Sequence, residues 1–408
     1  MVPDSASPIF SGIRVLDLSH QYSGALAACL LGDLGADVVA VEHPEGSPIR
    51  TMLPKKGTSS LWWKTLQRNK KSVTLRLSHP KGQEIFKQLV RNFDVVVENF
   101  RPRTLEKWGI GPDELRASGA DLVLVRISGF GQFGPMSTQP GYGTVAEAMS
   151  GFAHLNGFPD GPPVFPSTTL GDGVAATFAA FGAAAALANR YRTGASGLQV
   201  VDMALFEGLF RLIPVQMLAF DQLGMVMERP GNFLASHGVL RNLYRTEDGV
   251  YIAVAGGIGE HSIRRTLTAV DASALVIEVD GGVLRLGNEA CTDFLTRCND
   301  YLTIWCAARP YDEVAGRFHT FEVPAQRVYT SADIAADPQY AARDDLVRVA
   351  DEELGSILMP GVMPKFVGRT SQIKQAGGSL GSANEEVYGS YLGLSAEDLT
   401  ELRQDGVI

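Results

Sequence analysis

Short aliphatic runs alternate along the chain with longer stretches in which apolar residues recur at helical spacing. Residues 12–42 open with GIRVLDLS, continue with the periodic segment ALAACLLGDLGA and close with DVVAVE. A strand, a helix and a second strand within about thirty residues are typical of a parallel βαβ unit. The same order returns over residues 71–99, where a helical pattern lies between KSVTLRLS and DVVVEN.

A further aliphatic run, DLVLVRIS at 121–128, follows a short helical pattern near 112–118. In most of these runs apolar residues stand at consecutive positions, whereas KSVTLRLS has them at alternate positions. Strands of this kind are buried on both faces, as they are when helices cover both sides of a parallel sheet. The sequence therefore predicts an α/β fold built on a doubly wound, Rossmann-like sheet.

The pattern changes near residue 225. Residues 225–327 carry a short strand pattern, GVYIAVAG at 249–256, and helical stretches such as CTDFLTRCNDYLTIWCAAR. From residue 328 the chain returns to the first pattern and ends in the helical segment NEEVYGSYLG and a charged tail. We expect a large α/β domain formed by 1–224 and 328–408, and a smaller central α+β domain formed by 225–327.

Composition narrows the class of protein. The chain has 408 residues, 45% hydrophobic and 20% charged, so it can bury more than one core. Its formal net charge of −9 disfavours nucleic acid and anionic membrane as partners, since both require dense positive charge. The start MVPDSASPIF lacks the features of a signal peptide, and the uncharged run over 173–189 is shorter than a bilayer span of about 20 residues. We expect a soluble, cytoplasmic protein without membrane or nucleic-acid partners.

The cysteines do not suggest a metal or disulfide site. They stand at Cys29, Cys291, Cys298 and Cys306, without a C-x-x-C pair, and the sequence has no H-E-x-x-H motif. Scattered cysteines of this kind are typical of buried thiols. We therefore expect no metal.

The segment GFGQFG at 129–134 matches the G-x-G-x-x-G dinucleotide pattern and follows a predicted strand. A pyrophosphate site also requires a helix that begins directly after the glycines. Pro135, Pro140 and Gly141 disfavour such a helix. We interpret the segment as a loop that lines a site, and not as a nicotinamide or flavin site.

Asp172 is the most conspicuous single residue. It stands between Gly171 and Gly173 at the head of an alanine-rich run that has no other charge until Arg190. One interpretation is structural, because aspartate is a favoured helix N-cap. The other is functional, because the glycines leave room for a ligand and the positive end of a helix favours an ionised carboxylate. The residues alone leave both open.

Several segments resemble the class III CoA-transferases, a family that includes formyl-CoA and carnitine CoA-transferases and the related α-methylacyl-CoA racemases. The resemblance extends over nearly the whole chain. It rests on GIRVLDLS, LLGDLGADVVAVEHPEGSPIR, VVVENFRPRTLEKWGIG, ISGFGQFGP, GYGTVAEAMSG, the Gly171-Asp172 pair, GLQVVDMALFEG, VPAQRVYTSADIAADPQ and NEEVYGSYLGLS.

The resemblance implies a fold and an assembly. In that family the large domain contains both chain ends, the small domain comes from the middle, and two chains form an interlocked homodimer. It also implies an acyl-CoA:carboxylate CoA-transferase, with a CoA thioester and a carboxylic acid acceptor as partners and without a permanently bound cofactor.

The resemblance further implies that Asp172 is the catalytic nucleophile. Its carboxylate would attack the acyl-CoA carbonyl and expel CoA thiolate, leaving a mixed acyl–aspartyl anhydride. The thiolate would then attack the aspartyl carbonyl, release the donor acid and leave an aspartyl-CoA thioester. An incoming carboxylate would reverse these steps to give the new acyl-CoA.

The resemblance also implies which residues bind CoA. CoA requires cations for its phosphates, a flat apolar surface for adenine and polar groups for its pantetheine arm. The assigned positions are Gln21, Ser23, His43, Leu75, Asn99, Phe100, Lys107 and Trp108, with added charge from Arg101 and Arg103. His43 and Ser78 stand where relatives carry arginine or lysine, which weakens these two positions as phosphate ligands.

Tyr22, Tyr142 and Gly143 are the expected substrate-binding residues. Racemases of the superfamily carry a histidine where this chain has Tyr142, so transfer is favoured over racemisation, although Glu260 falls near another acid of the racemases. Many transferases carry an acidic residue where this chain has Gly143, a role that Glu147 could take. A racemase or epimerase and a non-catalytic acyl-CoA-binding relative remain as alternatives. No side-chain pattern identifies the donor or acceptor acid.

Overall fold

The computed structural model describes residues 7–286 and 288–408, which form two compact units. The larger unit comprises the chain up to Phe152, Phe165–Leu218 and Pro338–Ile408, and the smaller comprises Ala153–Val164 and Ala219–Asp337. The main segment of the smaller unit begins at Ala219, a few residues before the predicted 225, and ends at Asp337, ten residues after the predicted 327. The division also assigns to the smaller unit a segment before Asp172 that carries no sequence signal for a boundary.

A parallel sheet forms the centre of the larger unit. Its strand order is β5–β2–β1–β6–β7–β8, so the order reverses between β1 and β6. The strands are β1 (Arg14–Asp17), β2 (Asp37–Glu42), β5 (Lys70–Thr74), β6 (Val95–Glu98), β7 (Val123–Ser128) and β8 (Gln199–Ala204). The aliphatic runs predicted as buried strands thus form β1, β2, β5, β6 and β7.

Helices cover both faces of this sheet. On one face, Val15 and Val38 pack with the alanine-rich helices α1 (Tyr22–Asp33) and α8 (Leu170–Thr193). On the other face, the neighbouring residues Leu16 and Val39 pack with Phe86 of α3 (Pro80–Leu89) and with α17 (Asn384–Leu392). Consecutive strand residues therefore enter different cores, which explains why adjacent positions of these strands are both apolar.

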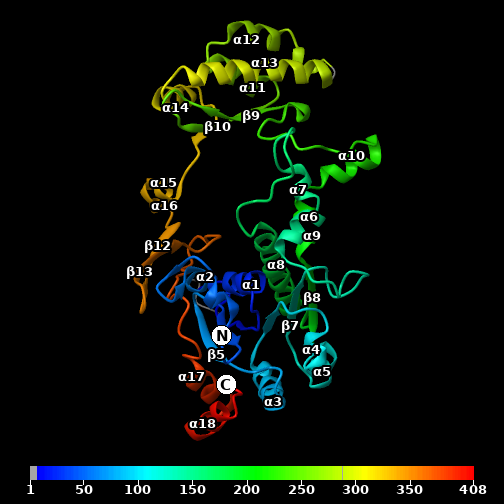
Figure 1. The fold of residues 1–408 in the computed structure, drawn as a ribbon, viewed down its shortest axis with the longest axis vertical. Helices are drawn as coiled ribbons and strands as arrows, with labels where there is room; N and C mark the ends of the chain where they lie inside the picture. Colours follow the sequence, from blue (N-terminus) through cyan, green and yellow to red (C-terminus); the bar gives the residue numbers. More distant parts are fainter. Residues whose placement is uncertain (1–6, 287) are drawn as a thin grey trace. The chain divides into compact units, whose positions relative to one another are not determined.

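Both chain ends contribute to the larger unit, and Figure 1 shows the carboxyl-terminal helix α17 near β5. The amide of Asn384 donates to the Thr74 hydroxyl at 2.8 Å, and the Tyr388 hydroxyl donates to the Thr74 carbonyl at 2.8 Å. Both helical residues are buried. The carboxyl-terminal helices are therefore part of the sheet's packing.

The remaining elements of the larger unit lie around the sheet. They are η1 (Pro48–Thr51), β3 (Lys55–Lys56), β4 (Ser59–Ser60), α2 (Leu61–Leu66), η2 (Val90–Asn92), α4 (Thr104–Lys107), α5 (Pro112–Ala117), α6 (Gly143–Met149), α9 (Leu205–Leu212), α16 (Pro338–Ala342), β12 (Leu346–Asp351), β13 (Gly355–Pro360) and α18 (Ala396–Gln404). Helices α7 (Phe152–Leu155) and α10 (Val215–Leu223) span the boundaries between units.

The smaller unit is built on the antiparallel sheet β11–β10–β9. Tyr244, Ile252, Phe294 and Phe318 are buried in its core. Its elements are η3 (Ala235–His237), β9 (Val239–Arg245), β10 (Tyr251–Ile258), α11 (Glu260–Ala269), α12 (Ser273–Asp280), η4 (Val283–Arg285), α13 (Asn288–Ala307), α14 (Tyr311–Thr320), β11 (Ala325–Arg327) and α15 (Ser331–Ala336). Strand β10 occupies the predicted 249–256 segment, whereas β9 has no counterpart in the prediction.

Helix α8 is long and apolar enough to cross a bilayer by length and composition alone, a property shared by core helices of soluble proteins. Ala175, Ala176 and Ala179 are fully buried in the core between α1 and the sheet. Phe181 and Tyr191 are exposed. One side of α8 is thus a core element of the larger unit.

Candidate active site

The candidate site lies where the strand order of the parallel sheet reverses. The chain leaves β1 and β6 at the same edge of the sheet, and connections that then diverge leave a crevice between them. Residues 18–23 follow β1, and residues 99–108 follow β6. A larger cavity and a narrow cleft are lined by these two segments.

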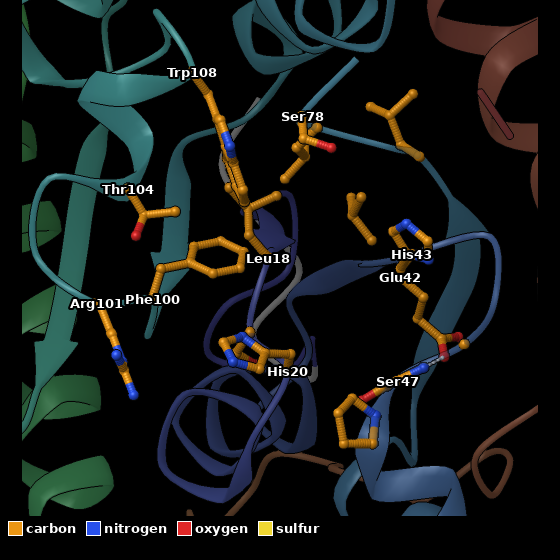
Figure 2. Close-up of a pocket in the computed structure, with 16 residues that line it drawn as sticks. Leu18, His20, Glu42, His43, Ser47, Ser78, Phe100, Arg101, Thr104 and Trp108 are labelled. Atoms are coloured by element: carbon orange, nitrogen blue, oxygen red, sulfur yellow. Dashed lines mark hydrogen bonds between the residues drawn. The ribbon is translucent and has the colours of Figure 1, made fainter. Parts of the chain in front are cut away.

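The larger cavity has a volume of about 490 Å³ and a wall of stacked rings. The ring of Phe100 lies 5.0 Å from that of His20 in a stacked arrangement, and 5.1 Å from that of Trp108 in an edge-on one. Figure 2 shows Trp108 and Phe100 on one side of the cavity and His43 on the other. The predicted CoA residues that line this cavity are His43, Leu75, Phe100, Arg101 and Trp108.

The narrow cleft has a volume of about 100 Å³ and contains Asp172 in its wall. His20, Phe100 and Arg101 line both the cleft and the larger cavity, so the two spaces meet at these residues. The other predicted residues that line the cleft are Gln21, Ser23, Asn99 and Tyr142. The structure therefore brings Gln21, Ser23 and Asn99 to Asp172 rather than to the aromatic wall.

Asp172 does not cap its own helix, so the capping interpretation is wrong. The N-cap residue of α8 is Thr169, and Asp172 lies within the first turn. The free N–H of Gly171 is instead bound by Glu147 of α6, whose carboxylate accepts it at 3.0 Å. Because Glu147 supplies the capping group, the Asp172 carboxylate is available to the cleft.

Gly143 allows the backbone of α6 to approach Asp172 closely. A Cβ atom added to Gly143 would lie 2.0 Å from Asp172 Oδ2, which is far inside contact distance. The backbone N–H of Gly143 and the hydroxyl of Ser23 both bind the Asp172 carboxylate. A side chain at residue 143 would therefore collide with the Asp172 carboxylate where it now lies.

Burial and the nearby Glu147 raise the pKa of Asp172 to about 6. The Gly143 N–H and the Ser23 hydroxyl act in the opposite direction but do not compensate. The helix terminus was expected to favour the ionised carboxylate, and burial acts against it. Near neutral pH the carboxylate is still mostly ionised.

This raised pKa predicts a pH dependence. If the ionised carboxylate is the reacting form, the neutral acid that predominates below pH 6 is inactive, so kcat/KM should rise through about pH 6 and level off above it. The measurement is kcat/KM against pH at constant ionic strength, which reports groups of the free enzyme. A profile that stays flat down to pH 4.5 would contradict this assignment.

A buried ion network fixes the segment that carries Phe100 and Trp108, and sequence reasoning missed it. Glu98 accepts the Phe100 N–H at 2.7 Å and the Arg126 Nε–H at 2.7 Å, and Arg126 also binds Glu106 of α4 at 2.6 Å. Arg126 and Glu98 are buried, and burial raises the pKa of Glu98 to about 7. The sequence signal for this network was the presence of two charged residues, Glu98 and Arg126, inside aliphatic runs.

A second buried pair supports the segment after β1. Asp17 accepts the backbone N–H of Ser19 at 2.9 Å and binds Lys70 of β5 at 2.8 Å. Both charged side chains are almost completely buried. Asp17 thereby fixes the start of the segment that continues through His20 and Ser23.

Some predicted residues lie away from both spaces. Arg103 and Lys107 are exposed and line neither the cavity nor the cleft. Tyr22 lies beside Gly173 and packs edge-on against Trp62 at 5.4 Å. Glu260 belongs to the smaller unit, where it binds Arg285 at 2.6 Å.

The GFGQFG segment is a loop, as predicted. No helix begins directly after its glycines, and the next one, α6, starts at Gly143. Gly129 lines the narrow cleft. Within residues 7–286 and 288–408, no group of three or more His, Cys, Asp or Glu side chains is arranged to hold a metal ion.

Comparisons with known proteins agree with this architecture. The family described as CoA-transferase family III matches residues 10–384. The succinyl-CoA–D-citramalate CoA-transferase of Chloroflexus aurantiacus is 36% identical, over 97% of each chain. The formyl-CoA:oxalate CoA-transferase of Streptomyces avermitilis is 32% identical, over 97% of this chain and 98% of that protein. A crystal structure of a CAIB/BAIF family protein from Brucella suis superposes with a TM-score of 0.79 at 25% identity, covering 94% of this chain and all of that one.

A family match over most of the chain and named transferases above 30% identity at nearly full length identify the protein as an enzyme that transfers CoA. The chain belongs to CoA-transferase family III.

Proposed function

We propose that the protein transfers CoA from an acyl-CoA to a dicarboxylic acid through covalent intermediates on Asp172. The observation that carries this proposal is the half-buried Asp172 carboxylate, held in a cleft that opens beside a larger cavity with an aromatic wall. The similar transferases named above act on citramalate and oxalate, and another from Chloroflexus aurantiacus acts on L-malate. All of these acids carry two carboxylates.

The proposed reaction begins when an oxygen of Asp172 attacks the thioester carbonyl. The C–S bond breaks, CoA leaves as a thiolate, and the acyl group is joined to Asp172 as an anhydride. The thiolate then attacks the aspartyl carbonyl, so that the donor acid leaves as a carboxylate and Asp172 holds CoA as a thioester. The acceptor carboxylate repeats both steps in reverse.

Several groups near Asp172 support this chemistry. The Gly143 N–H and the Ser23 hydroxyl bind the carboxylate and hold it in one orientation. Both groups can also stabilise negative charge on the aspartyl oxygen when the thiolate attacks. The narrow cleft limits the space for water, which would otherwise hydrolyse the anhydride.

CoA recognition is assigned to the larger cavity and the segment after β6. The rings of Trp108 and Phe100 offer a flat apolar surface for adenine or the pantetheine arm. Arg103 and Lys107 lie on the same segment with their charges in solvent, where CoA phosphates remain partly hydrated.

Replacing Trp108 with alanine tests this assignment. The variant should raise KM for the CoA thioester by about tenfold with little change in kcat, because it removes binding shared by ground and transition states. Tyr251→Ala, which removes an exposed ring of β10 in the smaller unit, is the control and should leave KM unchanged. A collapse of kcat at constant KM would refute a role in CoA binding.

The alternatives make different predictions. A racemase would need a second acid–base group at residue 142, where this chain has a half-exposed tyrosine. Deuterium entering the α-carbon of an acyl-CoA from solvent, without transfer of CoA, would support that reaction. A non-catalytic acyl-CoA-binding relative, suggested by Gly143 and by the lack of arginine or lysine at His43 and Ser78, would bind CoA tightly without exchanging labelled acid into the thioester. The close approach of Gly143 to Asp172 weakens the first of these two grounds.

We also propose an interlocked homodimer with a Rossmann-like large domain and a cytoplasmic location. The strand order of the parallel sheet supports the Rossmann-like assignment. The exposed apolar side chains of α8 and α10, such as Phe181 and Leu223, support burial against a second chain. A folded monomer obtained by simple dilution would contradict the interlocked assembly.

A further inference from the structure

The hydroxyl of Ser128 is a buried polar group of the narrow cleft that has no hydrogen-bond partner among the described residues. Ser128 is the last residue of β7, and only 6% of its surface is exposed. Burying a hydroxyl without a partner costs stability, and buried polar atoms normally have one. An unpaired hydroxyl in the wall of this cleft therefore indicates a role that a bound ligand completes.

The other donors of the cleft are either in use or ambiguous. The Ser23 hydroxyl and the Gly143 N–H already bind the Asp172 carboxylate. The Nδ1 atom of His20 is buried and unpaired within the described chain, but an imidazole nitrogen donates in only one of its two neutral tautomers. A serine hydroxyl can always donate. Ser128 is therefore a donor that can be assigned to a ligand without choosing a tautomer.

Ser128 and Asp172 reach the cleft from different faces of the parallel sheet. Side chains alternate between the two faces along a strand, so Ser128 shares the face of Arg126, which binds Glu98. Ile127 belongs to the opposite face, where it packs in the same core as α8, the helix that carries Asp172. A group bound in the cleft would have the carboxylate on one side and the hydroxyl on another.

Building on the proposed function, we propose that Ser128 is a second catalytic residue, whose hydroxyl donates a hydrogen bond to the carbonyl oxygen of the acyl group. When Asp172 attacks the thioester, the carbonyl double bond becomes a single bond and its oxygen takes the negative charge. The Ser128 hydroxyl, which keeps its proton, stabilises this oxyanion. The double bond forms again as the C–S bond breaks, and the sulfur leaves with the electron pair as a thiolate.

This assignment divides the donors of the cleft between two oxyanions. The second oxyanion forms on the aspartyl carbonyl when the thiolate returns, and the Gly143 N–H and the Ser23 hydroxyl already bind the oxygens of that group. Neither donor is then needed for the acyl oxygen. Ser128 supplies the donor that the first step would otherwise lack.

Ser128→Ala separates a catalytic role from a structural one. The measured quantities are Tm and the kcat and KM for exchange of labelled succinate into succinyl-CoA. Because the oxyanion exists in the transition state and not in the bound substrate, kcat should fall by about 100-fold while KM stays within about twofold of the wild type. Tm should equal or exceed that of the wild type, because the variant removes an unpaired buried hydroxyl.

Two further variants are the controls. Ser128→Cys has nearly the same shape but a weak donor, so its kcat should be close to that of Ser128→Ala. Ser395→Ala removes the hydroxyl that caps α18 and accepts the Asp398 N–H. It should lower Tm and leave kcat unchanged, which is the opposite pattern.

The carbonyl stretch of the bound substrate reports the hydrogen bond itself. Succinyl-CoA labelled with a heavy isotope at its thioester carbonyl carbon is bound to Asp172→Ala, which cannot form the anhydride with it. The infrared stretch should lie at a lower frequency in Asp172→Ala than in the double variant that also carries Ser128→Ala, because the hydrogen bond weakens the double bond.

Wild-type kcat in Ser128→Ala or in Ser128→Cys would overturn the proposal. A fall in kcat together with a lower Tm would overturn it in favour of a structural role, and identical carbonyl stretches in the single and double variants would exclude the hydrogen bond. A wild type that exchanges neither succinate nor malate into a thioester would refute the proposed function itself.

Discussion

Asp172→Asn should remove CoA transfer by on the order of 10⁴-fold or more while the protein stays folded, because an amide cannot form the anhydride or the aspartyl-CoA thioester. Asparagine has nearly the shape of aspartate, and its carbonyl oxygen can accept the Gly143 N–H and the Ser23 hydroxyl that bind the native carboxylate. Since Asp172 is not the cap of α8, no capping bond is lost.

The raised pKa of Asp172 predicts the direction in which Asp172→Asn changes the stability of the fold. The pKa of Asp172 is raised in the folded chain, so its ionised form costs stability above the unfolded-state pKa, and the full cost is present above about pH 6. A neutral amide removes that cost. Tm at pH 8 should therefore equal or exceed that of the wild type, while at pH 4 the two proteins should be alike.

Asp172→Ala is the companion variant, because partial hydrolysis of an asparagine that precedes Gly173 can regenerate some aspartate, which alanine cannot do. The alanine variant cannot revert. Both variants should be inactive, and any trace of activity that grows with storage should occur only in Asp172→Asn. Substantial turnover by folded Asp172→Ala would show that another group is the nucleophile.

Gly143→Ala should lower kcat by about 100-fold or more without unfolding the protein. The new methyl group would lie 2.0 Å from Asp172 Oδ2 and 2.9 Å from its Cγ, so the carboxylate must turn away from its reactive position. A displacement of about 1 Å in a reacting group can cost a factor of this size. Gly143 is the first residue of α6 and has no positive φ, so its backbone accepts alanine.

The matched control is Gly316→Ala, in α14 of the smaller unit. A Cβ atom there meets nothing within 4 Å, so activity should not change, and stability should rise slightly because alanine favours a helix. The measurements are kcat, KM and Tm for both variants. If Gly143→Ala retained wild-type kcat, the close approach of α6 to Asp172 would have no catalytic importance.

The strands of the larger unit were predictable because burial on both faces leaves a strong signal. DVVAVE at 37–42 is β2, and the valines of DVVVEN form β6. Consecutive valines enter different cores, so apolar residues dominate both faces, and buried charges of these strands are ion-paired, as Glu98 is with Arg126. Strand β9 was missed because its exposed face is polar and charged, as at Arg241 and Arg245, and its inward face carries few apolar residues.

The detailed geometry of the site was harder to predict from the sequence than the strands were. Aspartate after glycine suggested a cap for α8, but that helix begins earlier, and the capping carboxylate comes from Glu147 in another helix. Pairings between elements depend on tertiary packing, which local preferences do not encode. The rings of Phe100 and Trp108 lie together on one surface, and their contact with CoA stays a prediction. Arg103, the N-cap residue of α4, and Lys107, its last residue, are exposed.

The most direct test of the central claim is to identify the covalent intermediate. The wild type is incubated with succinyl-CoA without an acceptor, treated with hydroxylamine, digested and examined by mass spectrometry. The proposed reaction predicts an aspartyl hydroxamate at residue 172, absent from Asp172→Ala. An active enzyme that forms a hydroxamate at another residue, or none under conditions of full turnover, would contradict the assignment of Asp172 as the nucleophile.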